Sequence, residues 1–207
     1  MKNRQTGEAS AETAADPATK VRVRDRIFDT ACELFYRQGI RAVGVDAIAC
    51  EAGTNKMSFY RSFESKDELV AEYLRDAESR FWQWWDSVVA VHAGNPRRQA
   101  EWLFEKFIDK PCDKSNLGCA LGNAAVEIRD REHPGFAVVC GHKDEIRKRF
   151  RKLAREMKAV DADALGDALT LLMAGVASSR LVYSGKTGPS INAARAAKTL
   201  IEAHLPA

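Results

Sequence analysis

No stretch of this 207-residue sequence is apolar over the length of a membrane span, and its first residues lack the apolar core of a secretory signal. A strong charge of either sign is also missing, because 32 Lys and Arg residues face 29 Asp and Glu residues and leave a formal net charge of +3. Hydrophobic residues make up 45% of the chain, as is usual for a soluble globular protein. We therefore expect a cytoplasmic protein without a membrane partner.

The residue types that most often carry catalysis or hold metals are few. Five cysteines, an odd number without paired spacing, argue against a secreted disulfide framework. A thiol sensor stays open as an alternative, because Cys50 points away from the apolar face of its expected helix and Cys112 and Cys119 flank a loop. Cys140 and His142 lie about 200° apart around an expected helix, so they cannot easily share an ion. Four histidines outside any triad, metal or nucleotide motif predict no enzyme, no catalytic residues, no metal and no cofactor.

The most informative segment that is present runs from residue 45 to residue 63, where the pattern predicts two short helices joined by a tight turn. Apolar residues at i, i+3, i+4 and i+7 mark one face of the first helix: Val45, Ile48, Ala49 and Ala52. Gly53 supplies the left-handed residue that ends this helix. Asn55 can cap the N-terminus of a second helix that begins at Lys56.

The second helix has an inward and an outward face. Phe59 and Phe63 are four residues apart and point inward. The opposite face carries small, basic and apolar side chains: Met57, Ser58 and Arg61, with Lys56, Tyr60 and Ser62 on its flanks. A short helix anchored by two aromatics and presenting such a face suits the major groove of DNA. The segment is therefore predicted to be a helix-turn-helix.

The surroundings of this motif are typical of one family. A helix from Arg26 to Gly39 is expected before it, and residues 65–68 form a capping box after it. Residues 27–73 resemble the DNA-binding domain of the TetR family of bacterial transcriptional regulators through these matching positions: Ala31, Leu34, Phe35, Gly39, Ile48, Ala49, Ala52, Gly53, Lys56, Tyr60, Arg61, Phe63, Ser65, Lys66 and Leu69. Gly44 departs from the pattern, because a threonine or serine usually caps the second helix there. Ser62 departs as well, since a histidine is frequent at its position.

The resemblance implies a set of DNA-contacting residues: Thr54, Asn55, Lys56, Met57, Ser58, Tyr60, Arg61 and Lys66. Lys56, Tyr60 and Lys66 are expected to hold phosphates, and Met57, Ser58 and Arg61 to meet base edges. The net charge of this domain gives no further indication of DNA binding, because residues 20–75 contain ten basic and nine acidic residues, a net of +1. A basic cluster at the chain start could reach the minor groove or belong to an inert tail: Lys20, Arg22, Arg24 and Arg26.

The rest of the chain predicts helices and no strand, so the expected fold class is all-α. We expect a flexible arm over residues 1–19, a three-helix helix-turn-helix domain over 20–65, and a helical effector-binding and dimerisation domain over 66–207. Helices in the last domain are expected over 66–93, 96–110, 118–128, 134–158, 163–184 and about 190–204. Residues 143–158 hold eight basic and three acidic residues, which favours a solvated outer face over a membrane or nucleic-acid surface.

The helix expected over 163–184 is apolar on two faces. One stripe contains Leu165, Leu169, Leu172 and Val176, and the other contains Ala168, Leu171, Gly175 and Val182. A helix that is apolar all round belongs to a core or to an interface. The resemblance implies that this helix and the last one, about 163–184 and 190–204, form a four-helix interface in a homodimer. A single monomeric core is the alternative.

Five residues are candidates for an effector pocket: Trp82, Trp85, Trp102, Asn123 and Glu127. The tryptophans belong to a dense group of aromatics that could line a pocket for a flat or apolar ligand, although core packing would also explain most of that group. Asn123 and Glu127 are four residues apart on one expected helix and could serve as polar anchors, or could make structural hydrogen bonds.

Taken with the resemblance, these patterns predict a sequence-specific DNA-binding regulator, usually a repressor in this family. It would bind a palindromic DNA operator as a homodimer and leave it when an unidentified small-molecule effector binds. The alternative is a helical dimeric interaction module or thiol sensor with weak or no DNA binding.

Overall fold

The computed structural model describes residues 22–109, 117–183 and 188–206. The arm predicted over residues 1–19, Lys20 of the basic cluster and Cys112 lie outside these ranges. The described residues form the α-helices α1 (Val23–Gln38), α2 (Val45–Glu51), α3 (Lys56–Ser62), α4 (Lys66–Ala90), α5 (Pro96–Asp109), α6 (Ala120–Glu127), α7 (Pro134–Glu156), α8 (Ala162–Ser179) and α9 (Ala193–His204), with a 3₁₀ turn η2 (Pro189–Asn192) before α9. The all-α prediction is confirmed. No helix within the described ranges is both long and apolar enough to cross a membrane.

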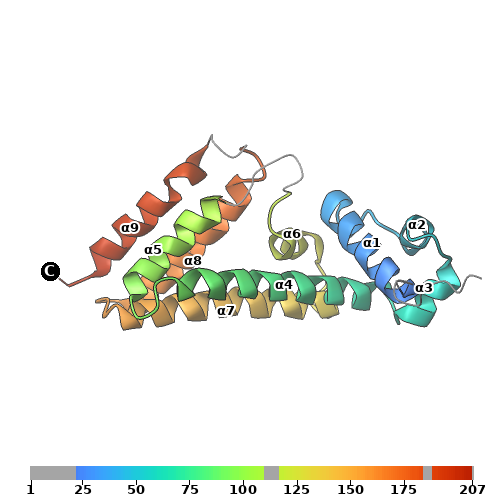
Figure 1. The fold of residues 1–207 in the computed structure, drawn as a ribbon, viewed down its shortest axis with the longest axis horizontal. Coiled ribbons are helices and arrows are strands. Elements are labelled where there is room, and N and C mark those ends of the chain that lie inside the picture. Colours follow the sequence, from blue (N-terminus) through green and yellow to red (C-terminus); the bar gives the residue numbers. More distant parts are fainter. Residues whose placement is uncertain (1–21, 110–116, 184–187, 207) are drawn as a thin grey trace, which may run out of the picture.

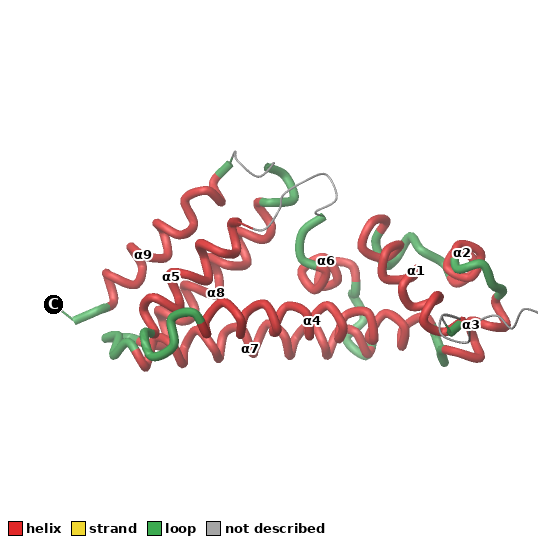
Figure 2. The backbone as a smooth tube through the Cα atoms, viewed as in Figure 1, coloured by secondary structure: helices red, strands yellow, loops and turns green. Residues whose placement is uncertain are grey.

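The molecule is elongated, with its two longest helices along its length. Helices α4 and α7 run side by side, and α1, α2 and α3 lie at one end of the pair (Figure 1). Helices α5, α8 and α9 cover the other end, and α6 lies between these two groups, next to α1 (Figure 1). Helices and connecting loops account for all of the backbone that is drawn in colour (Figure 2). Helices α1, α2 and α3 are thus linked to the C-terminal helices in two ways, through the continuous helix α4 and through α6, which lies next to α1.

Several helices end earlier than the sequence pattern predicts. Helix α8 stops at Ser179 rather than residue 184, and the three residues that follow Arg180 form a turn. Helix α7 stops at Glu156 because Lys158 adopts a left-handed φ of 58°, which interrupts the helix. Helix α4 stops at Ala90, and the turn after it contains Gly94 at a φ of 80°. The apolar spacing of α7 and α8 and the lack of proline and glycine before Gly94 therefore overestimated these helix lengths.

Two separate clusters of buried side chains form the core. The first unites α1, α2 and α3 with the beginning of α4, with α6 and with the start of α7, and it includes Phe59, Leu69, Tyr73 and Leu121. The second fills the space among the rest of α4, α5, α7, α8 and α9, and it includes Trp85, Phe104, Phe150 and Leu169. The first core therefore continues past the domain boundary expected between residues 65 and 66.

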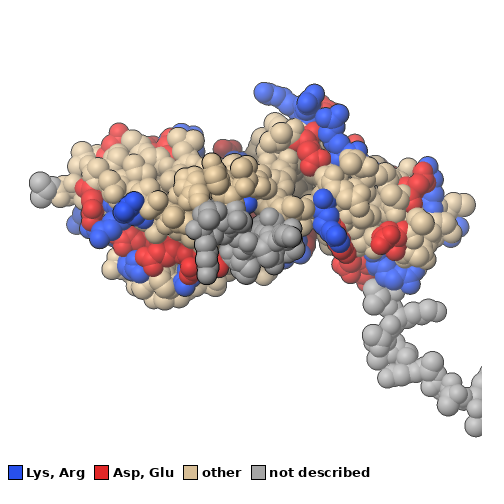
Figure 3. Space-filling view, turned by 90° about the horizontal axis from the view of Figure 1, so that it is seen from above, with Lys and Arg blue, Asp and Glu red and all other residues tan. Residues whose placement is uncertain are grey.

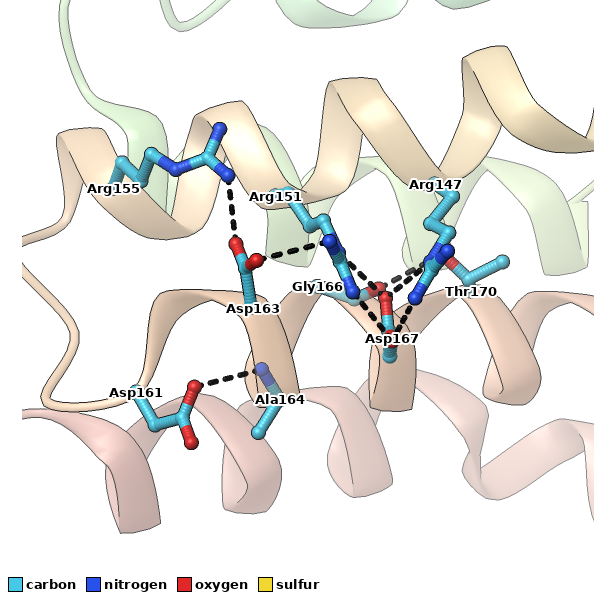
Figure 4. A network of polar contacts seen from close by, with 9 residues as sticks. All are labelled: Arg147, Arg151, Arg155, Asp161, Asp163, Ala164, Gly166, Asp167 and Thr170. Carbon is cyan, nitrogen blue, oxygen red and sulfur yellow. Dashed lines mark hydrogen bonds and ion pairs between the residues drawn. The ribbon is translucent and has the colours of Figure 1, made fainter.

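The contact between α7 and α8, which we call the seam, is closed by charged side chains. Three arginines one turn apart on α7 meet two aspartates one turn apart on α8: Arg147 and Arg151 bind Asp167, and Arg151 and Arg155 bind Asp163 (Figure 4). A Cβ atom at Gly166 would lie 2.7 Å from the Arg151 Cα atom, so glycine permits the close approach of the two backbones. This part of the basic helix is paired with α8, while Arg147 and Arg155 keep about half of their side-chain surface in solvent, as expected for a solvated outer face.

Candidate nucleic-acid interface

The helix-turn-helix forms as its sequence predicts, and each of its ends has a local cause. Gly44 precedes α2 in an extended conformation and offers no side-chain cap, as expected from its departure from the family pattern. Gly53 follows α2 at a φ of 62°, where a residue with a Cβ atom is strained. The Asn55 side-chain oxygen then accepts a hydrogen bond of 3.0 Å from the Ser58 amide, which caps α3.

Buried aromatics hold α3 so that its other face meets solvent. Phe59 is fully buried and Phe63 nearly so, and both belong to the first core. Met57 on the opposite face is 67% exposed, and Tyr60 on its flank is 51% exposed. Arg61 is exposed too, and it has no hydrogen-bond or ion-pair partner among the described residues. Helix α3 therefore presents one apolar, one aromatic and one cationic side chain that are free to meet a ligand.

Several of the other predicted DNA-contacting residues also make bonds within the chain, some of them through their backbone atoms only. The Lys56 ammonium lies 3.2 Å from the Asp46 carboxylate on α2. The Thr54 amide donates to the Ala49 carbonyl oxygen, and the Ser58 carbonyl oxygen accepts from the hydroxyl of Ser62, the position where a histidine is frequent in the family. These bonds within the chain do not prevent contacts with DNA phosphates. The roles of Thr54, Asn55, Lys56 and Ser58 in DNA binding stay predictions.

Lys66 and Arg24 have structural partners that the sequence pattern did not reveal. The Lys66 ammonium donates a hydrogen bond of 2.7 Å to the Ile40 carbonyl oxygen, and its burial there lowers its pKa. Arg24 binds the Glu72 carboxylate at 2.6 Å and lies over the Phe63 ring. Lys66 thus fastens the loop after α1 in this structure, and Arg24 fastens α1 to α4, while their contacts with DNA stay predictions. Arg22 is exposed and still suits a minor-groove role.

The surface of the DNA-binding end carries both signs of charge. Basic and acidic side chains lie together there on the face seen from above (Figure 3). This mixture agrees with the net charge of +1 over residues 20–75. Any affinity of this end for DNA must come from the position of a few cations rather than from a broad basic surface.

Helix α6 meets the N-terminal helices through hydrogen bonds at what we call the joint: Tyr36, Arg41, Leu117, Gly118 and Glu127. The Tyr36 hydroxyl accepts from the Leu117 amide at 2.9 Å and donates to the Gly118 carbonyl oxygen at 3.2 Å. The Glu127 carboxylate accepts from the Arg41 amide at 3.0 Å. Sequence patterns did not identify Tyr36 or Arg41, because nothing local marks a partner about 80 residues away.

The five residues predicted to line an effector pocket are not gathered in one place. Asn123 donates to the Leu117 carbonyl oxygen, and Glu127 belongs to the joint, so both anchor α6 instead. Trp102 lies on α5, where the cationic groups of Arg98 and Lys106 stack on its ring. Asn123 and Glu127 thus make the structural hydrogen bonds named as their alternative role, and a part for these three residues in an effector pocket stays a prediction.

Trp82 and Trp85 do lie together on α4, with their ring centroids 5.8 Å apart. Arg149 covers the Trp82 ring, and Trp85 packs on Phe150 in the second core. Trp85 also borders a groove of about 890 Å³ among α4, α5 and α7. The rim of this groove carries both charges, including Lys148 and Glu145. Effector binding at Trp82 and Trp85 stays a prediction.

Two further groups bear on the chemistry that the chain could perform. Burial, with a smaller effect from Asp76, raises the pKa of the Cys32 thiol to about 12, which disfavours the reactive thiolate. His142 on α7 is 1% exposed between the Phe81 and Trp82 rings. Burial, and then the charge of Lys143, lower the His142 pKa to about 4 and keep its ring neutral. Neither group has the surroundings of a nucleophile or a sensor at neutral pH.

Comparisons with known proteins agree on the N-terminal region. Residues 27–73 match the family model described as bacterial regulatory proteins, tetR family. The transcriptional repressor KstR2 of Mycolicibacterium smegmatis is 37% identical over 65 residues, which cover 31% of this chain. That match spans only 30% of the repressor's own length. The similarity to KstR2 therefore concerns a region of the size of the DNA-binding domain.

Other relatives extend the likeness to nearly the whole chain. YdgC of Bacillus subtilis, an uncharacterised helix-turn-helix regulator, is 25% identical over 193 residues and covers 90% of this chain and 94% of YdgC. The crystal structure of sav143 from Streptomyces avermitilis, assigned to the TetR transcriptional regulators, has a TM-score of 0.77 at 28% identity. The superposition covers 89% of this chain and 98% of that one. The C-terminal helices thus share the arrangement found in such regulators.

Proposed function

Because the chain belongs to the TetR family of bacterial transcriptional regulators, we propose that it represses transcription as a homodimer on a palindromic operator and is released by a small-molecule effector. The observation that carries the proposal is the outward face of α3, where Met57, Tyr60 and Arg61 are exposed while Phe59 anchors the helix. Such a helix fits the major groove, where the N-terminal residues of a recognition helix meet base edges. The same proposal places the protein in the cytoplasm, with DNA, and gives it no catalytic role.

DNA binding is tested by selecting bound duplexes from a random-sequence pool and measuring their affinity by fluorescence anisotropy. We expect an enriched inverted repeat whose half-sites are about one helical turn apart, with an affinity that falls steeply as salt rises. Arg61→Ala should cost about 1–3 kcal/mol of binding free energy and relax the base preference at one position. Arg80→Ala on α4 removes the same charge away from α3 and should change little. Weak binding without any enriched sequence would contradict the proposal.

Dimerisation is proposed through α8, with α9 beside it. Leu171 on α8 is 73% exposed, and space is open around Gly175 one turn later. Both lie on the second apolar stripe of this helix, which the core does not cover. Helix α9 supports the interface less strongly, because its exposed residues include the charged Arg195, Lys198 and Glu202. An uncovered apolar stripe on a long helix is suited to a two-fold contact with a second copy.

The oligomeric state tests this interface directly. Leu171→Glu places a charge in the proposed contact and should convert the dimer to a monomer in sedimentation equilibrium. It should also weaken operator binding, because two separate monomers would then have to bind the two half-sites independently. Val160→Glu, which also replaces an exposed apolar residue, lies in the connection between α7 and α8 and should leave the dimer intact. A dimer that persists in Leu171→Glu would place the interface elsewhere.

Release by an effector is proposed to pass through α6. A ligand that favours a different position of α6 would pull on Tyr36 and on the loop at Arg41, and would shift the population toward a spacing of the two α3 helices that no longer fits DNA. The proposal is tested by screening small molecules for loss of anisotropy from the operator complex. A hit should also raise the thermal stability of the free protein, since it binds the folded state.

A further inference from the structure

We propose that Met57 reads a thymine in each operator half-site by contact with the 5-methyl group of that base. This inference rests on the proposed DNA binding and deepens it, because it names the base and the kind of contact. It assigns sequence selection to an apolar side chain as well as to Arg61.

The position of Met57 on α3 is the first support. Met57 and Arg61 are one turn apart, and at 100° per residue each lies within about 20° of the direction opposite the buried Phe59. Met57 is the second residue of the helix, and the N-terminal part of a recognition helix enters the groove most deeply. The side chain therefore points along the axis on which the helix would approach DNA.

The exposure of Met57 is the second support. Met57 has 67% of its surface in water, so its apolar side chain is available to a partner without any rearrangement of the core. In the described part of the DNA-binding region, residues 22–65, the exposed large hydrophobic residues are Val23, Met57 and Tyr60. Two of the three lie on α3, so the apolar exposure of this region is concentrated on its recognition helix.

The neighbours of Met57 leave it as the residue available for such a contact. Lys56 pairs with Asp46, and the Asn55 side chain caps the helix through Ser58. Tyr60 lies about 60° to one side of Met57 and 100° from Arg61, and its ring packs edge-on against Phe59. The centre of the outward face is thus formed by Met57 and Arg61.

The chemistry of the two side chains selects different bases. Methionine has no hydrogen-bond donor and only a weak acceptor, so it can distinguish base edges in the major groove mainly by apolar contact, and the thymine methyl group is the apolar feature there. Arginine favours the two acceptors of guanine. The two residues are about 6 Å apart along the helix axis, against about 3.4 Å between base pairs. The thymine and the guanine should therefore lie within about two base pairs of each other.

The experiment removes only the methyl group. In the selected operator, each enriched thymine is replaced in turn by deoxyuridine, which keeps all hydrogen-bonding groups, and affinity is measured by anisotropy for the wild type, Met57→Ala, Met57→Leu and Arg61→Ala. At one thymine per half-site we expect the wild type to lose about fourfold in affinity for one replacement and about tenfold or more for both. Met57→Ala should be insensitive to the replacement, while Met57→Leu and Arg61→Ala should stay sensitive.

The outcomes separate this inference from the proposed function. An enriched operator whose binding by the wild type ignores every methyl group would overturn the inference and leave DNA binding intact. A methyl effect that persists unchanged in Met57→Ala would also overturn it, because another residue would then make the contact. If no operator is enriched, both proposals fail. Met57→Ala replaces an exposed helical residue with a better helix former, so its melting temperature should match that of the wild type.

Discussion

The seam between α7 and α8 and the joint between α6 and α1 join helices in different ways. At the seam, two backbones approach closely at Gly166 and two aspartates are shared by three arginines. At the joint, two hydrogen bonds at the Tyr36 hydroxyl and one accepted by the Glu127 carboxylate connect α6 and the residues before it to α1 and to the loop at Arg41. The seam cannot change without separating packed backbones, whereas the hydrogen bonds of the joint can exchange with water while Leu121 and Ala124 keep α6 in the first core.

This difference indicates which parts of the molecule can move. Close packing resists sliding, and segments held by few buried contacts open at low free energy. Helices α7 and α8 should therefore behave as one body that carries the proposed dimer face. Helix α6 is buried in the first core through Leu121 and Ala124, so the joint is expected to loosen at its hydrogen bonds to α1 and to the loop at Arg41, and the proposed release would act on these bonds.

The strongest test of the seam is Gly166→Ala. The added Cβ atom would lie 2.7 Å from the backbone nitrogen and Cα atom of Arg151, so the helices must separate, at a cost of about 3 kcal/mol. Thermal unfolding should show a loss of several degrees. Gly141→Ala on α7 is the matched control, because nothing lies within 4 Å of its new Cβ atom and alanine favours a helix. Equal melting temperatures for the two variants would contradict close packing at the seam.

The stability of the folded chain should also depend on pH through His142 on α7. The pKa of this histidine is about 4 in the folded chain and 6.5 at its ordinary value, so its stabilising effect is complete above about pH 6.5 and is lost as the pH falls toward 4. Between pH 7 and pH 5 this should remove about 2 kcal/mol from the free energy of unfolding, measured with urea. In His142→Leu, the free energy of unfolding should fall by about 2 kcal/mol less over the same pH range. Parallel pH profiles for the two proteins would show that His142 is not buried as a neutral ring.

The joint is tested by Glu127→Gln, which keeps the size of the side chain but weakens its bond to the Arg41 amide. We expect a stability loss of about 1 kcal/mol or less, because the bond is exposed, together with a several-fold change in operator affinity. Asn123→Ala tests the neighbouring bond to Leu117 in the same way. The comparison with the seam would fail if these variants altered the melting temperature as much as Gly166→Ala and left DNA binding unchanged.

The smallest expected effect comes from the ion pairs of the seam. Hydrogen bonds from Arg147 and Arg151 hold the pKa of Asp167 below its ordinary value of 3.8, so its contribution is present above that pH and is lost as the pH falls through the lower folded value. Asp167→Asn should lower the melting temperature slightly at pH 7, and less so in 1 M salt, because the pair is exposed and screened. If the difference in melting temperature between the wild type and Asp167→Asn did not shrink in salt, the loss would come from packing rather than from charge.

The sequence predicted the helix-turn-helix closely because its signals are local. Gly53 ends α2, Asn55 caps α3 and Phe59 faces inward, and each follows from residues only a few positions apart. The outward residues Met57 and Arg61 follow from the same 3.6-residue period. The pocket prediction was weaker, because apolar and aromatic side chains suit a core and a ligand site equally well.

Sequence alone therefore determined the helical class, the recognition helix and the two apolar stripes of α8, since periodicity and capping are encoded over one or two turns. Only the tertiary structure decided which stripe is covered, with Leu169 buried and Leu171 exposed. It also decided that Lys66, Arg24 and Glu127 serve contacts within the chain. The physical reason is that a charged side chain takes whatever partner folding brings to it, and residues far apart in the sequence leave no local mark of their meeting.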